Sequence, residues 1–311
     1  YYGVNAQTKH IILADRKTLK CPNGIVLGTP GSGKSFFAKR EMTNAFFATR
    51  DHILILDPEN EYTALTEQLH GQTIYLAPDS HSYLNPMDLD LSTDVGESPM
   101  LMQADFLLSQ CELMMASYGN PLMPIEKSLI DRCISLVYRD YLKNPKPENM
   151  PILGDLYQCL REQHNSRADD LATAMEIYVT GSLSYLNHRT NVDLNNRMVC
   201  YNTSKLGQGL KKLVMSNVQK HIWQRTAVNR YAGITTRIFL DEFHLLLKEP
   251  QTAAYTAEIY KRFRKWNGIP TSLTQNVKDL LDSSEIENIL ENSDFVLMLN
   301  QGASDRNILA L

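Results

Sequence analysis

The sequence predicts an α/β fold with a mostly parallel central sheet, interrupted by an all-helical insertion. Short apolar runs occur in both end regions of the chain, separated by stretches long enough to form helices. These runs are continuous rather than alternating, which is typical of parallel strands covered on both faces. In the middle of the chain the runs disappear, and leucine and methionine recur at helical spacing between prolines.

Residues 1–92 are predicted to form the first part of the core. Residues 25–27, 53–56 and 73–76 are the apolar runs expected to be strands, and residues 35–50 form the helix after the first run. Asp57 and Pro58 follow the second run. Aspartate is a good N-cap and proline suits the first helical position, so a helix is expected to start there.

Residues 93–190 are predicted to form the insertion, with four or five helices between about residues 97 and 187. Five prolines punctuate the expected helix ends: Pro121, Pro124, Pro145, Pro147 and Pro151. The leucine and methionine stripe of this region predicts core packing. A helical lid or a partner surface is the alternative interpretation.

Residues 191–311 are predicted to complete the core. Strands are expected at residues 198–201 and 237–240 and near 271–273 and 295–298. Helices are expected at residues 210–228 and 253–266. The sheet would therefore be built from both ends of the chain.

The composition excludes several classes of protein. A net charge of −4 and a pI near 6.1 argue against a protein whose whole surface binds nucleic acid, but they do not exclude a local basic patch. Five scattered cysteines without a C-x-x-C pair indicate reduced thiols. No apolar run approaches the ~20 residues of a membrane span, and no signal peptide is visible. The chain begins with Tyr1 rather than Met, so we expect it to be a piece of a longer protein.

Residues 28–35 fit the Walker A pattern G-x-x-x-x-G-K-[ST] between a predicted strand and a predicted helix. Glycines in this loop let backbone N–H groups converge on phosphates, and the N-terminal end of the following helix favours anions. Lys34 is predicted to reach the β- and γ-phosphate oxygens, and Ser35 is predicted to bind magnesium. The expected nucleotide-binding residues are Gly28, Thr29, Pro30, Gly31, Ser32, Gly33, Lys34, Ser35 and Phe36.

Residues 236–242 form an apolar strand that ends in two acids, which is a Walker B element when it accompanies Walker A. Asp241 would hold magnesium opposite Ser35. Glu242 would act as general base toward the attacking water. A helix cap or a solvated turn is the alternative reading of the two acids. His244 follows them and is expected to be a packed helix residue, because the eight histidines show no ligand spacing.

Gln275 follows the predicted strand near residues 271–273, so it would open onto the same edge of the sheet as both Walker elements. A glutamine there can bond the γ-phosphate and the attacking water. An ordinary polar loop residue is the equal alternative. Near the second strand, Asp57 or Glu61 could likewise influence the magnesium site, or serve only the local helix start.

The predicted helix at residues 253–266 carries Arg262 and Arg264 near its end. Glu258 precedes Arg262 by four residues and could simply pair with it. The alternative is an arginine finger offered to the γ-phosphate of a neighbouring subunit. A basic patch that contacts DNA is a weaker third interpretation, since few aromatic residues accompany the charges.

These pieces together resemble the TraC-type conjugation ATPases of type IV secretion systems, within the HerA–FtsK group of RecA-like motors. The resemblance spans nearly the whole chain. The residues that carry it are Tyr1-Tyr2-Gly3-Val4-Asn5, the cradle at 28–35, Leu56-Asp57-Pro58-Glu59-Asn60-Glu61-Tyr62, Asn85-Pro86-Met87-Asp88, Phe239-Leu240-Asp241-Glu242 and Thr274-Gln275.

The resemblance implies a RecA-like P-loop NTPase that hydrolyses ATP with Mg²⁺ and powers substrate export and pilus assembly. It implies a cytoplasmic homo-hexamer at the inner face of the membrane, with secretion-channel components and other secretion ATPases as partners. Arg264 matches the trans-acting arginine of the family better than Arg262. The N-terminal docking domain of the family is absent from this sequence.

Three other functions remain open on the sequence alone. The chain could be a DNA-translocating or helicase-like motor that grips nucleic acid directly, although its acidity does not favour this. It could be a nucleotide-gated assembly scaffold with little turnover, but Glu242 counts against that. A small-molecule kinase with the insertion as its lid is the least favoured, because the arginines of the insertion are not clustered.

Overall fold

The computed structural model describes residues 1–91, 98–115, 122–248, 250–275, 284–302 and 306. The chain folds into two compact units. Unit 1 joins residues 1–51 with residues 235–311, so it is made from both ends of the sequence. Unit 2 comprises residues 52–234.

Unit 1 contains four parallel strands in the order β7-β8-β3-β9. They are β3 (Gly24–Leu27), β7 (Thr236–Leu240), β8 (Gly268–Thr274) and β9 (Phe295–Met298). Every residue of β3, β7 and β8 is buried, which explains why, apart from Arg237, they are apolar or small. Residues of β9 alternate between half-buried and exposed, as suits a strand with one covered face.

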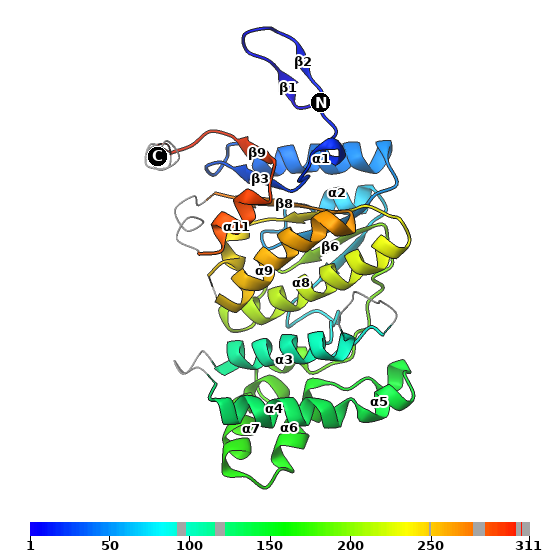
Figure 1. The fold of residues 1–311 in the computed structure, drawn as a ribbon, viewed down its shortest axis with the longest axis vertical. Helices are drawn as coiled ribbons and strands as arrows, with labels where there is room; N and C mark the ends of the chain where they lie inside the picture. Colours follow the sequence, from blue (N-terminus) through cyan, green and yellow to red (C-terminus); the bar gives the residue numbers. More distant parts are fainter. Residues whose placement is uncertain (92–97, 116–121, 249, 276–283, 303–305, 307–311) are drawn as a thin grey trace. The chain divides into compact units, whose positions relative to one another are not determined.

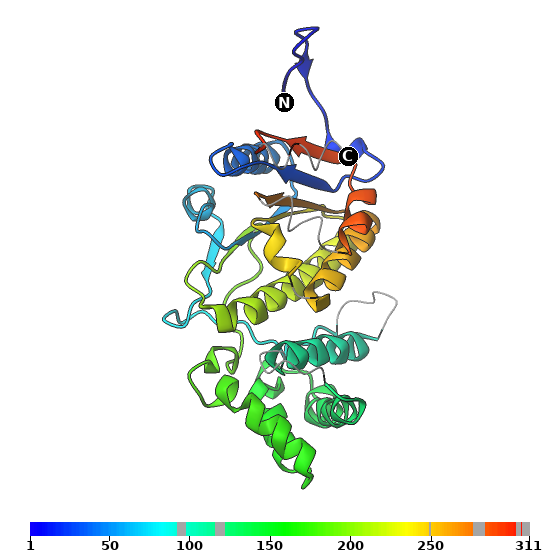
Figure 2. The ribbon, with the colours of Figure 1, turned by 90° about the vertical axis from the view of Figure 1, so that its left-hand side faces the viewer.

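Helices cover both faces of these strands. Figure 2 shows α1 (Lys34–Ala48) on one side, with α9 (Pro250–Phe263) and the short α11 (Ile286–Glu291) on the other. One face of α9 packs inward, and among its buried side chains are Ala253, Ala257, Tyr260 and Phe263.

The helix expected at residues 253–266 needs one correction. The α-helix begins at Pro250, where proline suits the first turn, and ends at Phe263. Its last turn is the 3₁₀ helix η6 (Arg264–Trp266), which Asn267 closes with a left-handed φ of 54°. A tight turn of this kind is a common way to end a helix.

A β-hairpin near the start of the chain was not foreseen from the sequence. Its strands β1 (Gly3–Val4) and β2 (Ile11–Ile12) are antiparallel, and Figure 1 shows them clear of the four-stranded part of the unit. The 3₁₀ helix η1 (Arg16–Thr18) follows. Strands of two residues give no periodic signal that could be read from the sequence.

Unit 2 contains three parallel strands in the order β5-β6-β4. They are β4 (His52–Asp57), β5 (Gln72–Tyr75) and β6 (Met198–Asn202). The helices beside them in sequence are α2 (Thr63–Gln68) and the long α8 (Gln208–Tyr231). The strands of both units thus confirm the predicted mostly parallel fold.

The middle of the chain is helical, as predicted. Its α-helices are α3 (Pro99–Met115), α4 (Pro124–Val137), α5 (Arg139–Lys143), α6 (Leu153–Arg161) and α7 (Ser166–Val179). The 3₁₀ helix η3 (Pro147–Asn149) lies between α5 and α6, and the 3₁₀ helix η4 (Ser184–Leu186) follows α7. Between β5 and β6 the described residues contain no strand (Figure 1). The domain boundary expected at residues 92 and 93, like Pro121, lies outside the described residues.

The segment Asn85-Pro86-Met87-Asp88 joins the helical region to α8 within unit 2. Gln103 of α3 donates to the carbonyl of Pro86 over 2.9 Å, and Asn85 donates to Pro151 O over 2.8 Å. Lys220 of α8 donates from Nζ to Pro86 O at 2.8 Å and to Asp88 O at 2.6 Å. Burial lowers the pKa of Lys220 from 10.5 to about 7. This motif therefore serves as a buried hydrogen-bonding centre of the unit.

Candidate nucleotide site

The loop between β3 and α1 has the backbone of a phosphate cradle. Gly31 and Gly33 have left-handed φ angles of 73° and 98°, which glycine adopts without strain. A Cβ at Gly28 would lie 2.3 Å from Ser32 Oγ, so a larger residue there would force the loop to shift. The three glycines of the motif are thus each required by the shape of the loop.

Neighbouring strand ends hold the cradle in place. The N–H of Gly28 donates to Thr274 O at 3.3 Å, and the N–H of Thr29 donates to Asn300 O at 2.9 Å. The hydroxyl of Thr29 donates to the same carbonyl of Asn300 at 3.0 Å. These bonds connect the loop to the last residue of β8 and to a residue that follows β9.

Lys34 is buried at the first position of α1, and its side chain returns to the loop. Its Nζ donates to Gly28 O at 2.9 Å and to Thr29 O at 3.2 Å. The Oγ of Ser32 is buried and has no hydrogen-bond partner, so the cradle contains a polar atom that a ligand could satisfy. Ser35 is half-buried beside Lys34, whereas Phe36 is 73% exposed.

The strand register brings three motifs to one edge of unit 1. Strand β8 lies between β7 and β3, with Leu240 opposite Ser272 and Leu27 opposite Thr274. Because the strands are parallel, the residues after each carboxyl end lie at the same edge. Those residues are the cradle from Gly28, the acids Asp241 and Glu242, and Gln275.

Asp241 and Glu242 are both buried, and the backbone turns sharply between them. Glu242 has a left-handed φ of 45°, and its N–H donates to Asp241 Oδ1 at 3.0 Å. Gln275 Nε2 donates to Glu242 Oε1 at 2.8 Å. The predicted base and the predicted sensor are therefore in direct contact, although they are 33 residues apart in sequence.

His244 also belongs to this cluster, a contact with Glu242 that was not expected from the sequence. It lies in the 3₁₀ helix η5 (Phe243–Leu246), and its Nδ1 lies 3.2 Å from Glu242 Oε2. The same nitrogen lies 3.4 Å from Thr274 Oγ1. The only signal in the sequence was the position of His244 two residues after Glu242. In a single 3₁₀ turn, that spacing brings the two side chains into contact.

Arg264 lies away from the cradle of its own chain. Its Nη1 donates to Cys21 Sγ at 3.4 Å, and Cys21 precedes the first residue of β3. Arg264 also precedes β8, so it lies at the amino-terminal edge of these strands. The loop that follows Leu27 lies at the opposite, carboxyl-terminal edge. Arg262 pairs with Glu258 on the surface of α9, one of the alternatives that the sequence left open.

Asp57 does not begin a helix, contrary to the prediction. Its Oδ1 accepts from the N–H of Glu61 at 2.9 Å and its Oδ2 from the N–H of Tyr62 at 2.9 Å. Asn60 has a left-handed φ of 59°, which interrupts helical geometry, so α2 begins only at Thr63. The buried carboxylate thus closes its own turn, which favours the local structural role over a role in metal binding.

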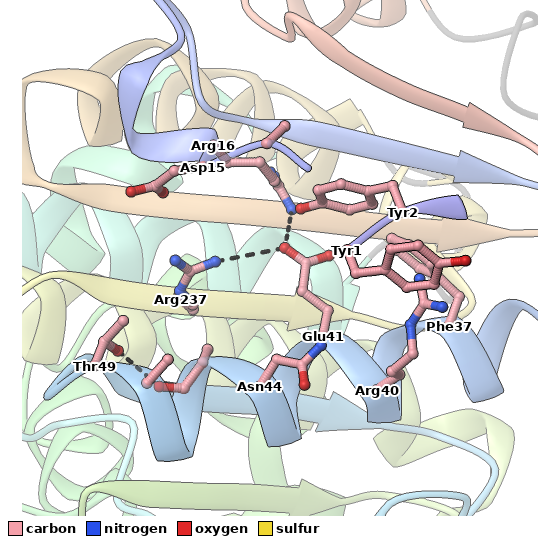
Figure 3. Close-up of a pocket in the computed structure, with 13 residues that line it drawn as sticks. Tyr1, Tyr2, Asp15, Arg16, Phe37, Arg40, Glu41, Asn44, Thr49 and Arg237 are labelled. Atoms are coloured by element: carbon pink, nitrogen blue, oxygen red, sulfur yellow. Dashed lines mark hydrogen bonds and ion pairs between the residues drawn. The ribbon is translucent and has the colours of Figure 1, made fainter. Parts of the chain in front are cut away.

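A cluster of buried charged side chains stabilises α1 (Figure 3). Arg16 and Arg237 both donate to Glu41 Oε1, at 2.9 and 3.4 Å, beside a cavity of about 310 Å³. Arg237 also pairs with Asp51 at 2.9 Å. Burial by itself would raise the pKa of Asp51, but hydrogen bonds from Lys17 and Arg237 outweigh it and lower the pKa. This cluster, which the sequence did not reveal, connects α1 to β7.

The residues at the carboxyl ends of β3, β7 and β8 have the chemistry needed to bind a magnesium nucleotide. Hydroxyl and carboxylate oxygens, as in Ser35 and Asp241, are the ligands that Mg²⁺ prefers. The glycine-rich turn, the buried amine of Lys34 and the unpartnered Ser32 hydroxyl suit phosphate oxygens.

Comparisons with solved structures agree with this fold. VirB4 of Thermoanaerobacter pseudethanolicus matches with a TM-score of 0.85 and 23% identity, over 99% of this chain and 86% of that one. The plasmid coupling protein TrwB in complex with the ATP analogue ADPNP matches with a TM-score of 0.62 and 14% identity, over 92% and 72%. TrwB in complex with ADP and Mg²⁺ gives a TM-score of 0.59 and 13% identity, over 98% and 75%.

Sequence comparison assigns the family. No curated protein sequence matches the chain significantly. The profile of the TraG P-loop domain, however, matches residues 12–307, which is nearly the whole chain. The chain therefore belongs to the TraG P-loop domain family, in agreement with the resemblance to conjugation and type IV secretion ATPases.

Proposed function

We propose that this chain is the ATP-hydrolysing motor domain of a conjugative type IV secretion system, powering substrate export and pilus assembly. The observation that carries the proposal is the meeting of three motifs at one edge of β7, β8 and β3. The cradle, the acid pair and Gln275 lie there together, and Gln275 is bonded to Glu242.

Each residue has a role that follows from its position and chemistry. Lys34 binds the β- and γ-phosphate oxygens, while Ser35 and Asp241 hold Mg²⁺. Glu242 activates the attacking water as general base. Gln275 contacts the γ-phosphate or that water through the amide that reaches Glu242 Oε1.

The backbone around the cradle supplies the remaining nucleotide contacts. The N–H groups of Gly31, Gly33, Lys34 and Ser35 would converge on the phosphates at the N-terminal end of α1. The exposed side chain of Phe36 is available to the base or the ribose. Support for ATP with Mg²⁺ comes from the similar fold of TrwB, which was solved with ADPNP and with ADP and Mg²⁺.

The arginine of the mechanism comes from a neighbouring copy in a homo-hexamer. Arg264 lies at the opposite strand edge from its own cradle, which supports a role toward the nucleotide of another subunit. Arg262 is the second candidate, but its pairing with Glu258 favours a surface role. The partners in this proposal are inner-membrane channel components and other secretion ATPases, with the ring at the cytoplasmic face of the membrane. Among the described residues, the helices are all too short or too polar to cross a membrane.

Hydrolysis of Mg-ATP by the purified chain tests the proposal. We expect phosphate release from the wild type and its loss in Lys34→Ala, because the charge that meets the phosphates is removed. Lys143→Ala, at an exposed lysine of α5, is the matched control and should leave the rate unchanged. Wild-type activity in Lys34→Ala, or no binding of Mg-ATP to the wild type, would overturn the assignment of this site.

Two alternative functions predict different results in related assays. A DNA-translocating motor would bind DNA with a steep dependence of log K on log salt, because phosphate contacts release counterions. A nucleotide-gated scaffold would bind Mg-ATP and release almost no phosphate even with its partners present. The acidic composition and the buried general base support the secretion motor over both.

A further inference from the structure

The two oxygens of the Glu242 carboxylate have different surroundings. Oε1 accepts the hydrogen bond from Gln275. Oε2 is buried and receives no hydrogen bond of good geometry from the described residues. A buried carboxylate oxygen without a donor costs free energy, so a donor nearby would be used. His244 Nδ1 lies 3.2 Å away and is in reach after a small rotation of either side chain.

The environment of His244 decides which form of the ring fits. Its Nδ1 lies near Glu242 Oε2 and 3.4 Å from Thr274 Oγ1, so two oxygen atoms face one nitrogen. If that nitrogen carried a lone pair, it would point at an ionised carboxylate and repel it. The tautomer that bears hydrogen on Nδ1 is therefore the one compatible with an ionised Glu242. The His244 side chain is only 13% exposed, which restricts the ring to this place.

We propose that His244 is a positioning residue that holds Glu242 through Oε2 for attack on the γ-phosphate; this rests on the proposed function. Glu242 occupies a left-handed turn, so its side chain is not fixed by helix or strand packing. Gln275 cannot bind phosphate or water with the same N–H that it gives to Oε1. When Gln275 turns to the nucleotide, His244 remains as the contact that keeps the carboxylate oriented.

Substitutions of His244 separate positioning from packing. His244→Phe keeps a ring of similar size without an N–H, and we expect kcat to fall about 10-fold with the Kd for Mg-ATP unchanged. His244→Asn keeps an N–H donor close to the position of Nδ1 and should recover most of kcat. His10→Ala, an exposed histidine of the hairpin, is the control and should behave as wild type.

A double-mutant cycle adds a result that a packing role would not give. In the Glu242→Gln background, His244→Phe should have no further effect on kcat, because the residue it positions is already inactive. An unchanged kcat in His244→Phe, or equal losses in the Phe and Asn variants, would overturn the inference. If His244→Phe does not fold, the Asn variant still decides, since loss of its activity contradicts the proposal. A wild type without ATPase activity would instead contradict the proposed function.

Discussion

Gln275 Nε2 donates a 2.8 Å hydrogen bond to Glu242 Oε1, across the carboxyl ends of two neighbouring parallel strands. Both side chains are needed at the same place if a phosphate is to be sensed and a water activated. Their contact shows that the strand register brings them to within one hydrogen bond of each other. The carboxylate is thereby limited to a narrow range of orientations.

Glu242→Gln should abolish turnover while nucleotide remains bound. The amide still accepts the hydrogen bond from Gln275 but cannot remove a proton from water, so we expect phosphate release to fall at least about 100-fold. Retention of radiolabelled ATP after rapid filtration measures the trapped nucleotide. Glu258→Gln, at the surface partner of Arg262, is the control. Rapid cleavage of bound ATP by Glu242→Gln would exclude the general-base role.

Arg264→Ala should lower activity only when subunits assemble. The side chain lies at the opposite strand edge from its own cradle, so its effect on hydrolysis must come through a neighbour. At protein concentrations that allow assembly we expect a loss of at least ~10³-fold, which is the effect typical of an arginine finger. Arg262→Ala should change the rate little, because that side chain pairs with Glu258.

Mixing two inactive variants tests Arg264 by complementation between subunits. Arg264→Ala subunits keep an intact cradle, and Lys34→Ala subunits keep an intact arginine. Mixed assemblies should therefore regain part of the ATPase activity that neither variant has alone. Absence of recovery, or an equal loss in a dilute monomer, would show that Arg264 does not act in trans.

Lys220 should make the free energy of unfolding depend on pH in the alkaline range. Burial lowers its pKa from 10.5 to about 7, so between these values the unfolded chain holds a proton that the folded chain lacks. The free energy of unfolding contributed by this group is therefore lowest below about pH 7 and rises as the pH approaches 10.5.

Urea unfolding at pH 7 and pH 9.5 measures this effect. Relative to Lys220→Met, the wild type should gain a few kcal/mol between the two values, since each pH unit corresponds to about 1.4 kcal/mol. Lys212→Met is a control on the same helix, because the side chain of that lysine is only half-buried. Identical pH profiles for wild type and Lys220→Met would show that the amine is charged in the folded protein.

Glu41→Gln should destabilise the protein strongly. It removes the charge that Arg16 and Arg237 share, which leaves the buried Arg16 guanidinium without its carboxylate and Arg237 with Asp51 alone. Breaking a buried ion pair in this way costs about 3–5 kcal/mol. Glu148→Gln breaks an exposed pair with Lys146 and should cost less than about 1 kcal/mol. Thermal unfolding compares the two, and an equal small shift in Tm would mean that the cluster contributes little.

Much of the fold followed from the sequence because local patterns carry it. The continuous apolar runs predicted β3, β4, β6 and β7 closely, and the prolines and helical spacing predicted the all-helical segment. Short elements escaped prediction, since the two-residue strands of the hairpin and the six residues of α11 have no periodicity to detect. The helix expected at Asp57 failed because Asn60 takes a left-handed conformation that the residue types did not reveal.

The sequence by itself determined the chemistry: a Walker A loop, an acid pair after an apolar strand, and a glutamine after another. These are local patterns in which the order of residue types is sufficient. Only the tertiary structure decided that β8 lies between the strands of both Walker motifs, and hence that Gln275 and His244 contact Glu242. It also decided that Glu41 gathers Arg16 and Arg237 in the core. Such contacts join residues that are distant in the chain, and strand order and register, which set them, leave no mark in the local sequence.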